Sequence, residues 1–409
     1  MQYKITHPTK KVNAVIDLPT SKSISNRLLI IRALYKQNFN IHKLATADDT
    51  QLLLKALKLN QPKVDVGAAG TSSRFLTALL SITEGNWHLC GTERLHNRPI
   101  ETLVNALKSL GADISYAEKE GYLPLNIKGK TLNGGNINIK GTISSQFISA
   151  LLMIGPTLKN GLQLNIQGEL VSTPYVQMTL KLMQNFGVEH TWSGNQISIL
   201  PQNYTAKDYT VEADWSAASY FFTIAALAKQ SKLLLNGLFQ TSVQGDQAMQ
   251  QITKPIGIKS IFMKPYLHLI KASPTTKKLV YDFTKCPDLA QTVAVYCAAL
   301  GIPAQFSGLQ TLRRKETNRI VALQNELSKV GVSFNSNNDI HFELSGKAKS
   351  TPQIPKFETY EDHRMAMSFA PLALILPQII INEPMVVTKS YPNFWEDLKK
   401  MGFTIEKIN

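Results

Sequence analysis

The sequence has few cysteines and no long apolar run. Its three cysteines, Cys90, Cys286 and Cys297, show no Cys-x-x-Cys spacing. This usage indicates a reducing compartment, with neither a disulfide framework nor a cysteine metal knuckle. No apolar stretch approaches the roughly 18 residues of a membrane-spanning helix, and the N-terminus lacks the apolar core of a signal peptide. We therefore expect a cytoplasmic protein.

The chain also lacks a low-complexity tract and a terminal run of Lys and Arg, although it is strongly basic. Its 44 basic and 29 acidic residues give a net charge of +15 over 409 residues. This charge suits nucleic acid, anionic lipid or small acidic substrates. The densest basic cluster is only Arg313-Arg314-Lys315, which is unlike the basic arm of a nucleic-acid-binding protein. The length predicts two or three domains.

Six short polar turns, each opening a helix, recur along the chain at a nearly fixed spacing. With positions 22, 71, 145, 215, 288 and 363 as references, the successive differences are 49, 74, 70, 73 and 75. Such a period predicts stacked copies of one supersecondary unit. The start of a helix presents unpaired N–H groups and the positive end of a dipole, so the repeated turns can collect anions.

A second landmark keeps the same period. Helical runs end on a glycine before a short alternating strand at Gly111, Gly187, Gly257, Gly331 and Gly402, and Leu59-Asn60 stands near that place in the first copy. Glycine readily adopts the left-handed conformation that stops a helix. Each copy is predicted to run strand, helix, strand, helix, strand, strand, with hairpin turns at 194–195 and 337–339. Six copies, three and three, would give two similar α/β domains.

Several of the polar turns carry candidate anion-binding groups. Lys22 and Arg27 follow serines at a predicted helix start, where two cations are unfavourable unless an anion joins them. Gly70 permits close approach of the backbone to a ligand, and Arg98 offers a planar fork for a carboxylate or phosphate. Ser144, Ser145 and Gln146 supply hydroxyls and an amide without charge. From the local sequence alone, an ordinary helix start remains the alternative for the turns at Gly70 and Ser144, and a surface arginine remains the alternative for Arg98.

Glu316 is the strongest acid–base candidate. On a helix it neighbours Arg319 at i and i+3. Nearby cations lower the pKa of a carboxylate, whereas burial or a bound anion raises it. Asp288 is the second candidate, with a plain helix cap as its alternative. Adjacent Asp362 and His363 lack a third metal ligand, so we expect an oriented Arg364 there rather than a metal site.

The most specific motifs occur together, in one order and spacing, at residues 18–27, 144–147, 172–175, 315–319 and 362–367. In these motifs, and over nearly its whole length, the chain resembles the 5-enolpyruvylshikimate-3-phosphate synthases. The resemblance implies two inverse α/β domains, each of three βαβαββ units. Residues 20–212 would form the domain mainly for shikimate 3-phosphate. Residues 1–19 plus 213–409 would form the domain mainly for phosphoenolpyruvate, with the active site in the cleft between the two.

That family transfers the enolpyruvyl group of phosphoenolpyruvate to the 5-hydroxyl of shikimate 3-phosphate, on the way to chorismate and the aromatic amino acids. Phosphate is released by addition and elimination through a tetrahedral intermediate. The resemblance implies that the catalytic residues are Lys22, Asp288 and Glu316. It implies that shikimate 3-phosphate is bound by Lys22, Ser23, Arg27, Ser144, Ser145, Gln146, Ser172, Tyr175, Asp288 and Lys315. It implies that phosphoenolpyruvate is bound by Lys22, Gly70, Arg98, Gln146, Arg319, Arg364 and Lys389.

The resemblance also implies a monomer without metal or organic cofactor, and without a nucleic-acid or membrane partner. One departure is Ala68, which stands where many members have Asn and affects one polar contact near phosphoenolpyruvate. Two alternative functions are considered. The sister transferase acting on UDP-N-acetylglucosamine shares the fold but commonly uses a cysteine in an Arg- and Gly-rich loop, and none of the three cysteines lies in such a loop. A nucleic-acid-binding protein would need clustered basic residues with interleaved aromatics.

Overall fold

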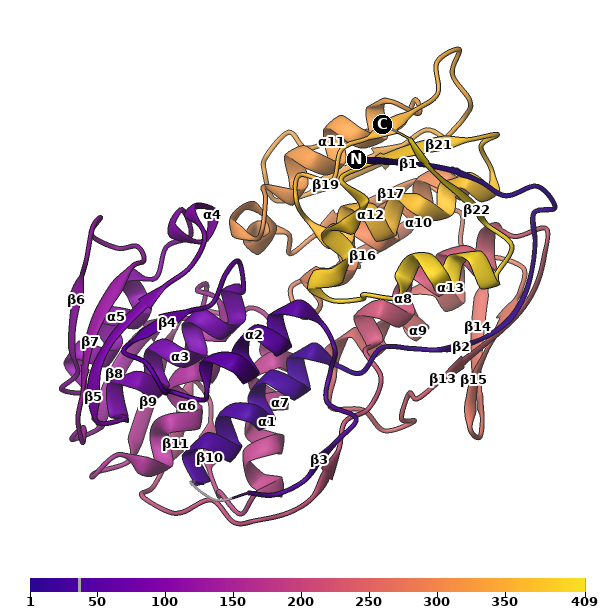
Figure 1. Ribbon diagram of the computed structural model, residues 1–409. Coiled ribbons are helices and arrows are strands. Elements are labelled where there is room, and N and C mark those ends of the chain that lie inside the picture. Colours follow the sequence, from indigo (N-terminus) through magenta and orange to yellow (C-terminus); the bar gives the residue numbers. More distant parts are fainter. Residues whose placement is uncertain (36–37, 409) are drawn as a thin grey trace. The chain divides into compact units, whose positions relative to one another are not determined.

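The computed structural model describes residues 1–35 and 38–408 and has mixed α/β structure. Its internal contacts divide the chain into two compact units (Figure 1). Unit A is Ser21–Val211, and unit B is Met1–Thr20 together with Glu212–Asn409. Among the described residues, no helix combines the length and apolarity needed to cross a membrane.

Unit A holds the first three repeats. The second repeat comprises β4 (Lys63–Asp65), α3 (Gly70–Ile82), β5 (Gly85–Cys90), α4 (Glu93–His96), α5 (Glu101–Ser109), β6 (Asp113–Tyr116) and β7 (Leu125–Gly129). Its sheet has the order β4-β5-β7-β6, in which only the β4–β5 pair is parallel.

The third repeat has the same topology. It comprises β8 (Gly135–Lys140), α6 (Ser145–Ile154), η1 (Gly155–Thr157), β9 (Leu162–Gln167), α7 (Thr173–Asn185), β10 (Thr191–Ser193) and β11 (Gln196–Ile199), in the order β10-β11-β9-β8. The shorter first repeat comprises α1 (Lys22–Tyr35), β3 (Ile41–His42), α2 (Asp48–Ala56) and the distant β12 (Tyr209–Thr210), which pairs in parallel with β3. The last strand of unit A thus completes its first repeat.

Unit B holds the other three repeats, and the N-terminal segment completes two of them. The fourth comprises β2 (Lys11–Asp17), α8 (Trp215–Leu227), β13 (Gln230–Asn236), η2 (Gly245–Ala248), α9 (Met249–Thr253), η3 (Lys254–Ile256), β14 (Ile258–Met263) and β15 (Tyr266–Lys271). The fifth comprises β16 (Leu279–Asp282), η4 (Pro287–Leu289), α10 (Ala290–Leu300), β17 (Ala304–Ser307), η5 (Gln310–Arg314), α11 (Arg319–Ser328), β18 (Ser333–Asn335) and β19 (Phe342–Ser345).

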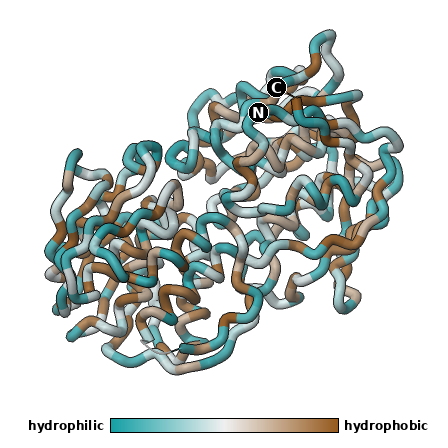
Figure 2. The backbone as a smooth tube through the Cα atoms, in the orientation of Figure 1, coloured by the Kyte–Doolittle hydropathy of each residue, from teal (hydrophilic) through white to brown (hydrophobic). Residues whose placement is uncertain are grey.

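The sixth repeat comprises β20 (Lys356–Phe357), α12 (His363–Phe369), η6 (Ala370–Leu374), β21 (Ile379–Asn382), η7 (Pro384–Lys389), α13 (Phe394–Lys400), β22 (Thr404–Ile408) and β1 (Gln2–Thr6). Strand β1 lies between β21 and β22, while β2 pairs in parallel with β13. In each unit, apolar residues run along the inner helices (Figure 2). Helix α6 is an example, since every residue from Phe147 to Ile154 is buried.

The structure confirms the predicted helix stops. All five glycines have positive φ, at 102°, 82°, 109°, 77° and 93° in chain order. In the first repeat Leu59 takes the same conformation, with a φ of 46°. The hairpin turn predicted at 337–339 is longer than predicted: β19 begins only at Phe342, because Asp339, with a φ of 58°, prolongs the turn.

The stop at Leu59 generates a stability prediction. A side chain in the left-handed region costs about 1 kcal/mol relative to glycine, so Leu59→Gly should raise the free energy of unfolding by about 0.5–1 kcal/mol in urea titrations. The matched control is Leu57→Gly, because Leu57 has an ordinary φ of −69° and should lose stability. A loss of stability in both variants would contradict the prediction.

Candidate active site

The start of α1 places Lys22 beside a carboxylate that the sequence analysis missed. Lys22 Nζ lies 2.9 Å from Asp49 Oδ2, with both side chains less than one-fifth exposed. Asp49 lies in the first turn of α2, where an acidic residue is favourable on electrostatic grounds. The pair orients Lys22 and partly balances its charge.

Arg27 lies one turn further along α1 and is 2% exposed. Its guanidinium donates to the hydroxyls of Thr179 at 2.7 Å and Ser149 at 3.1 Å, and to the carbonyl oxygen of Ser23 at 2.9 Å. Burial lowers the pKa of Arg27 to about 10. Among the described residues its hydrogen bonds go to neutral oxygens, and a buried cation held in this way favours the binding of an anion.

The starts of α3 and α6 are linked by side chains. Ser144 caps α6 by accepting from the Gln146 N–H at 3.3 Å, and the Gln146 amide donates to the Thr71 hydroxyl at 3.0 Å. A Cβ on Gly70 would lie 2.8 Å from Cζ of Arg98. Glycine is therefore required for the Arg98 guanidinium to lie against the first turn of α3.

The remaining predicted residues of unit A lie at two helix starts. Ser145 is the first residue of α6. Ser172 precedes α7 in the left-handed conformation, with a φ of 57°, and Tyr175 lies in the first turn of α7. These positions present hydroxyls at helix N-termini, where the helix dipole favours phosphate oxygens.

In unit B the central feature is the guanidinium of Arg319, which is 1% exposed. It contacts Asp288 at 2.8 Å, Glu316 at 2.7 Å and Asp362 at 2.6 Å. Burial alone would lower the pKa of Arg319, but these three carboxylates raise it above its usual range. The group is therefore permanently charged, and it joins the starts of η4, α11 and α12.

Asp288 is shared among three cations. Besides Arg319, its carboxylate lies 3.3 Å from Lys315 Nζ and 3.2 Å from a terminal nitrogen of Arg364. Arg364 also donates to the Asp288 carbonyl oxygen at 3.3 Å. Lys389 Nζ donates to the Glu361 carbonyl oxygen at 3.1 Å, beside the turn that opens α12. The structure thus brings together the predicted residues Asp288, Lys315, Glu316, Arg319 and Arg364.

Three supporting residues of this cluster were not predicted as site residues. Asp362 binds Arg319 and caps α12 by accepting from the Arg364 N–H at 2.9 Å. The Ser216 hydroxyl accepts from Arg364 at 3.2 Å and donates to buried Asp246. The place of Ser216 in the fourth polar turn could have indicated it, whereas nothing in the sequence around Asp246 does.

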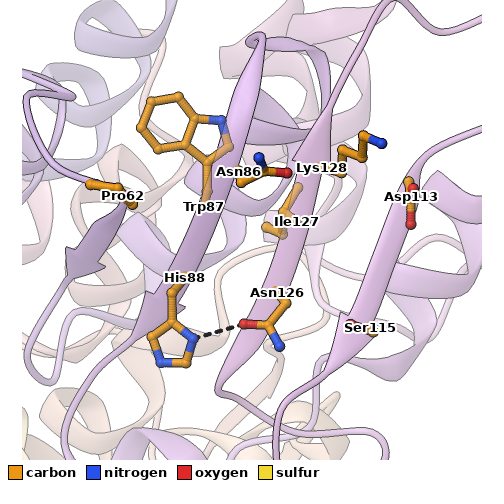
Figure 3. Close-up of a pocket in the computed structure, with 9 residues that line it drawn as sticks. All are labelled: Pro62, Asn86, Trp87, His88, Asp113, Ser115, Asn126, Ile127 and Lys128. Carbon is orange, nitrogen blue, oxygen red and sulfur yellow. Dashed lines mark hydrogen bonds between the residues drawn. The ribbon is translucent and has the colours of Figure 1, made fainter.

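Other candidates for a functional site are a metal-binding cluster and a pocket away from these residues. Within residues 1–35 and 38–408, no group of three or more His, Cys, Asp or Glu side chains is arranged to hold a metal ion. A shallow pocket of about 360 Å³ lies on β5, β6 and β7, where His88 Nδ1 and Asn126 Oδ1 are 2.8 Å apart (Figure 3). None of the predicted site residues lines this pocket.

Comparison with known proteins explains this arrangement. The family model described as EPSP synthase (3-phosphoshikimate 1-carboxyvinyltransferase) matches residues 6–61 and 58–398. The chain belongs to the EPSP synthase family. A 3-phosphoshikimate 1-carboxyvinyltransferase of Bacteroides fragilis is 48% identical over 407 residues, covering 99% of each chain. One of Vibrio campbellii is 34% identical, covering 98% of this chain and 100% of its own.

The fold of an EPSP synthase from Acinetobacter baumannii is also similar. It matches with a TM-score of 0.80 at 21% identity, over 99% of this chain and 100% of its own. This likeness confirms the predicted fold class of two α/β domains built from six repeats. The family match confirms the resemblance drawn from the motifs.

The buried carboxyl of Asp246 generates a pH prediction. Burial, and then the charge of Asp288, raise its pKa from 3.8 to about 6, against the opposing charge of Arg364. Asp214 and the Cys286 thiol face the same carboxyl. The folded chain therefore holds this proton more tightly than the unfolded chain between about pH 4 and pH 6, and folding stability falls as pH rises through that window.

Asp246→Asn removes this dependence. The variant's free energy of unfolding, minus that of the wild type, should increase by up to about 3 kcal/mol between pH 4 and pH 6 and stay constant above pH 7. Urea titrations at each pH measure the difference. Exposed Asp339→Asn is the control. A difference that does not depend on pH would show that Asp246 is ionised throughout.

Proposed function

We propose that this member of the family transfers the enolpyruvyl group of phosphoenolpyruvate to the 5-hydroxyl of shikimate 3-phosphate and releases phosphate. Family membership over the full length supplies the reaction class. The observation that carries the assignment of roles is Asp288, one carboxylate shared by Lys315, Arg319 and Arg364. Three cations around one carboxylate suit substrates that bring several negative charges.

We assign phosphoenolpyruvate mainly to the cationic side chains, and to Gly70, where the backbone allows a ligand to come close. In unit B, Arg319 and Arg364 offer planar forks that match its carboxylate or phosphate, and Lys389 adds a point charge. In unit A, the assigned residues are Lys22, Gly70, Arg98 and Gln146. The fit of Arg98 over Gly70 supports this assignment, because it holds a guanidinium at the start of α3.

Shikimate 3-phosphate is assigned to the hydroxyl-lined helix starts. In unit A, the assigned residues are Lys22, Ser23, Arg27, Ser144, Ser145, Gln146, Ser172 and Tyr175. The buried charge of Arg27, held by neutral oxygens, supports a phosphate nearby. In unit B, Lys315 and Asp288 complete the set.

The chemical steps are assigned to Asp288, Glu316 and Lys22. Asp288 accepts the proton of the 5-hydroxyl while that oxygen attacks, and Glu316 donates a proton to the methylene carbon, giving the tetrahedral intermediate. Glu316 then removes a proton from the new methyl group as phosphate leaves, with Lys22 as the shared acid and base. Substrate anions compete with Glu316 for Arg319, which raises the proton affinity of Glu316 and suits it to donate.

We also infer a monomeric, cytoplasmic enzyme that does not bind nucleic acid. The three cysteines are free and buried, as in a reducing compartment. Basic residues are scattered along the chain rather than gathered in an arm. Tight binding to single- or double-stranded DNA at physiological salt would contradict the last inference.

One assay tests the activity directly. Phosphate release from phosphoenolpyruvate is measured with shikimate 3-phosphate and, separately, with UDP-N-acetylglucosamine. We expect turnover with the first only. Turnover with UDP-N-acetylglucosamine alone would assign the chain to the sister reaction, and turnover with neither would refute the proposal.

Glu316→Gln tests the proton donor. Loss of general acid–base catalysis should lower kcat by about 100-fold or more, while calorimetry should show nearly unchanged binding of both substrates. The control is Glu396→Gln. Glu396 is exposed and pairs with Lys399 at i,i+3, as Glu316 pairs with Arg319. An unchanged kcat would remove Glu316 from the chemistry.

Arg364→Ala tests the phosphoenolpyruvate assignment. Removing one charged hydrogen-bond donor should raise the KM for phosphoenolpyruvate by roughly 10-fold or more, and the KM for shikimate 3-phosphate much less. Arg313→Ala is the control, because Arg313 pairs with exposed Asp339 outside the cluster. Equal increases for both substrates would instead indicate a structural role for Arg364.

A further inference from the structure

The outer face of the sheet in the fourth repeat is unusually apolar. Its order is β14-β15-β13-β2, and alternate residues of each strand are buried against the helices of unit B. The residues that point the other way include Val15, Ile261, Met263 and Ile270, which are 49%, 47%, 57% and 42% exposed. The described residues include twelve exposed large apolar side chains, and four of the twelve lie on this one face. They therefore form a patch rather than scattered positions.

Strand register places the patch across the whole sheet. Ile261 pairs with His268, His268 with Leu234, and Leu234 with Val15, so one row crosses all four strands. Met263, paired with Tyr266, extends the next row. Side chains paired in this way on one face are in contact.

The four other repeats with a four-stranded sheet supply an internal comparison, because their strands have the same order. The corresponding row is Lys63, His88, Asn126 and Ser115 in the second repeat. It is Asn138, Asn165, Gln196 and Ser193 in the third. It is Val280, Gln305, Glu343 and Asn335 in the fifth. It is Lys356, Ile380, Lys4 and Glu406 in the sixth. These rows are polar apart from Val280 and Ile380, so the fold does not itself require an apolar outer face.

The same repeat carries much of the positive charge. Residues 229–278 contain eight lysines, no Arg, no Glu and one Asp, so their net charge is 8 − 1 = +7 of the chain's +15. The single carboxyl of this range, Asp246, is 3% exposed. Strand β2 adds one exposed carboxyl on the patch side, Asp17, which accepts from the Asn236 amide at 2.7 Å. Lys11, Lys232 and Lys259 alternate with inward residues and lie on the patch side of β2, β13 and β14.

The charge and composition of the patch indicate which partner it binds: a second copy of the chain, another protein or a lipid surface. In a symmetric pair of copies the lysines of this patch would face one another. Strand and residue spacings give the face dimensions of about 14 Å by 14 Å, and this area is far below the roughly 800 Å² that each partner of a stable dimer buries. Protein interfaces are depleted in Lys and enriched in Arg. Lysines that flank exposed Ile and Met, with Asp17 as the one acidic residue on this side of the four strands, match an anionic bilayer surface instead.

We propose that this outer face binds the chain peripherally to an anionic lipid surface. The aliphatic side chains enter the interface, and the lysines extend their charges to the lipid phosphates. This revises the expectation of no membrane partner, which rested on the lack of spanning segments and on the family resemblance. The proposal does not depend on the enzymatic reaction.

The test is cosedimentation of the full chain with vesicles. Vesicles of phosphatidylcholine with about one-third phosphatidylglycerol should bind the chain at least about 10-fold more tightly than pure phosphatidylcholine, and added salt should weaken this binding. Ile261→Ser with Met263→Ser should lower the affinity about 10-fold or more. Lys232→Gln with Lys259→Gln should do the same, each variant keeping full phosphate-release activity as the check on folding.

Val280→Ser is the matched control, since Val280 is 65% exposed and occupies the same row of the fifth repeat. It should leave vesicle binding unchanged. No preference for anionic vesicles, or equal effects of the patch and control substitutions, would overturn the proposal. So would a dimer in analytical ultracentrifugation that the patch substitutions abolish, because the patch would then be covered by a second copy.

Discussion

The site in unit B depends on one buried charge, the guanidinium of Arg319. Its three carboxylate partners belong to the starts of η4, α11 and α12, which lie far apart in the sequence. Removing one partner of a buried ion cluster typically destabilises a protein by about 3–5 kcal/mol, because the remaining charges are left unpaired. The interaction that fixes the geometry of these helix starts is thus also a stability requirement.

This arrangement sets different conditions for anion binding in the two units. In unit B, Asp288 already partly neutralises Lys315 and Arg364, so a substrate anion must compete with a carboxylate. In unit A, Arg27 is held by hydroxyls and carbonyl oxygens, and an anion there displaces no negative charge. Competition for Arg319 has a chemical consequence, since a carboxylate that loses part of a cation gains proton affinity. In the mechanism that we propose, substrate binding and proton transfer are therefore coupled through the Arg319 guanidinium.

The repeats were predictable from the sequence because helix starts and stops are local. Ser144 caps its own helix, and Gly331 needs only its own backbone freedom. The partners of the supporting residues were not predictable, because they are distant in the sequence: 148 positions separate Ser216 from Arg364. The exchange of β1 and β2 into later repeats is likewise a long-range pairing, with Leu234 opposite Val15. Local sequence patterns thus locate the turns, whereas the folded structure is needed to show which turns contact one another.

A repeated scaffold makes differences between equivalent positions informative. The six turns occupy similar places in their repeats, yet the Ser216 hydroxyl of one accepts from a neighbouring arginine, Arg364, whereas Lys22 of another pairs with an acid, Asp49. The outer rows behave in the same way: the fold tolerates largely polar rows at four sheets and carries Ile261 and Val15 in the corresponding row of the fourth repeat. Since the backbone demands are equal, such a difference reflects a demand from outside the repeat. For Ser216 that demand is the position of Arg364; for the apolar row we propose that it is an anionic lipid surface.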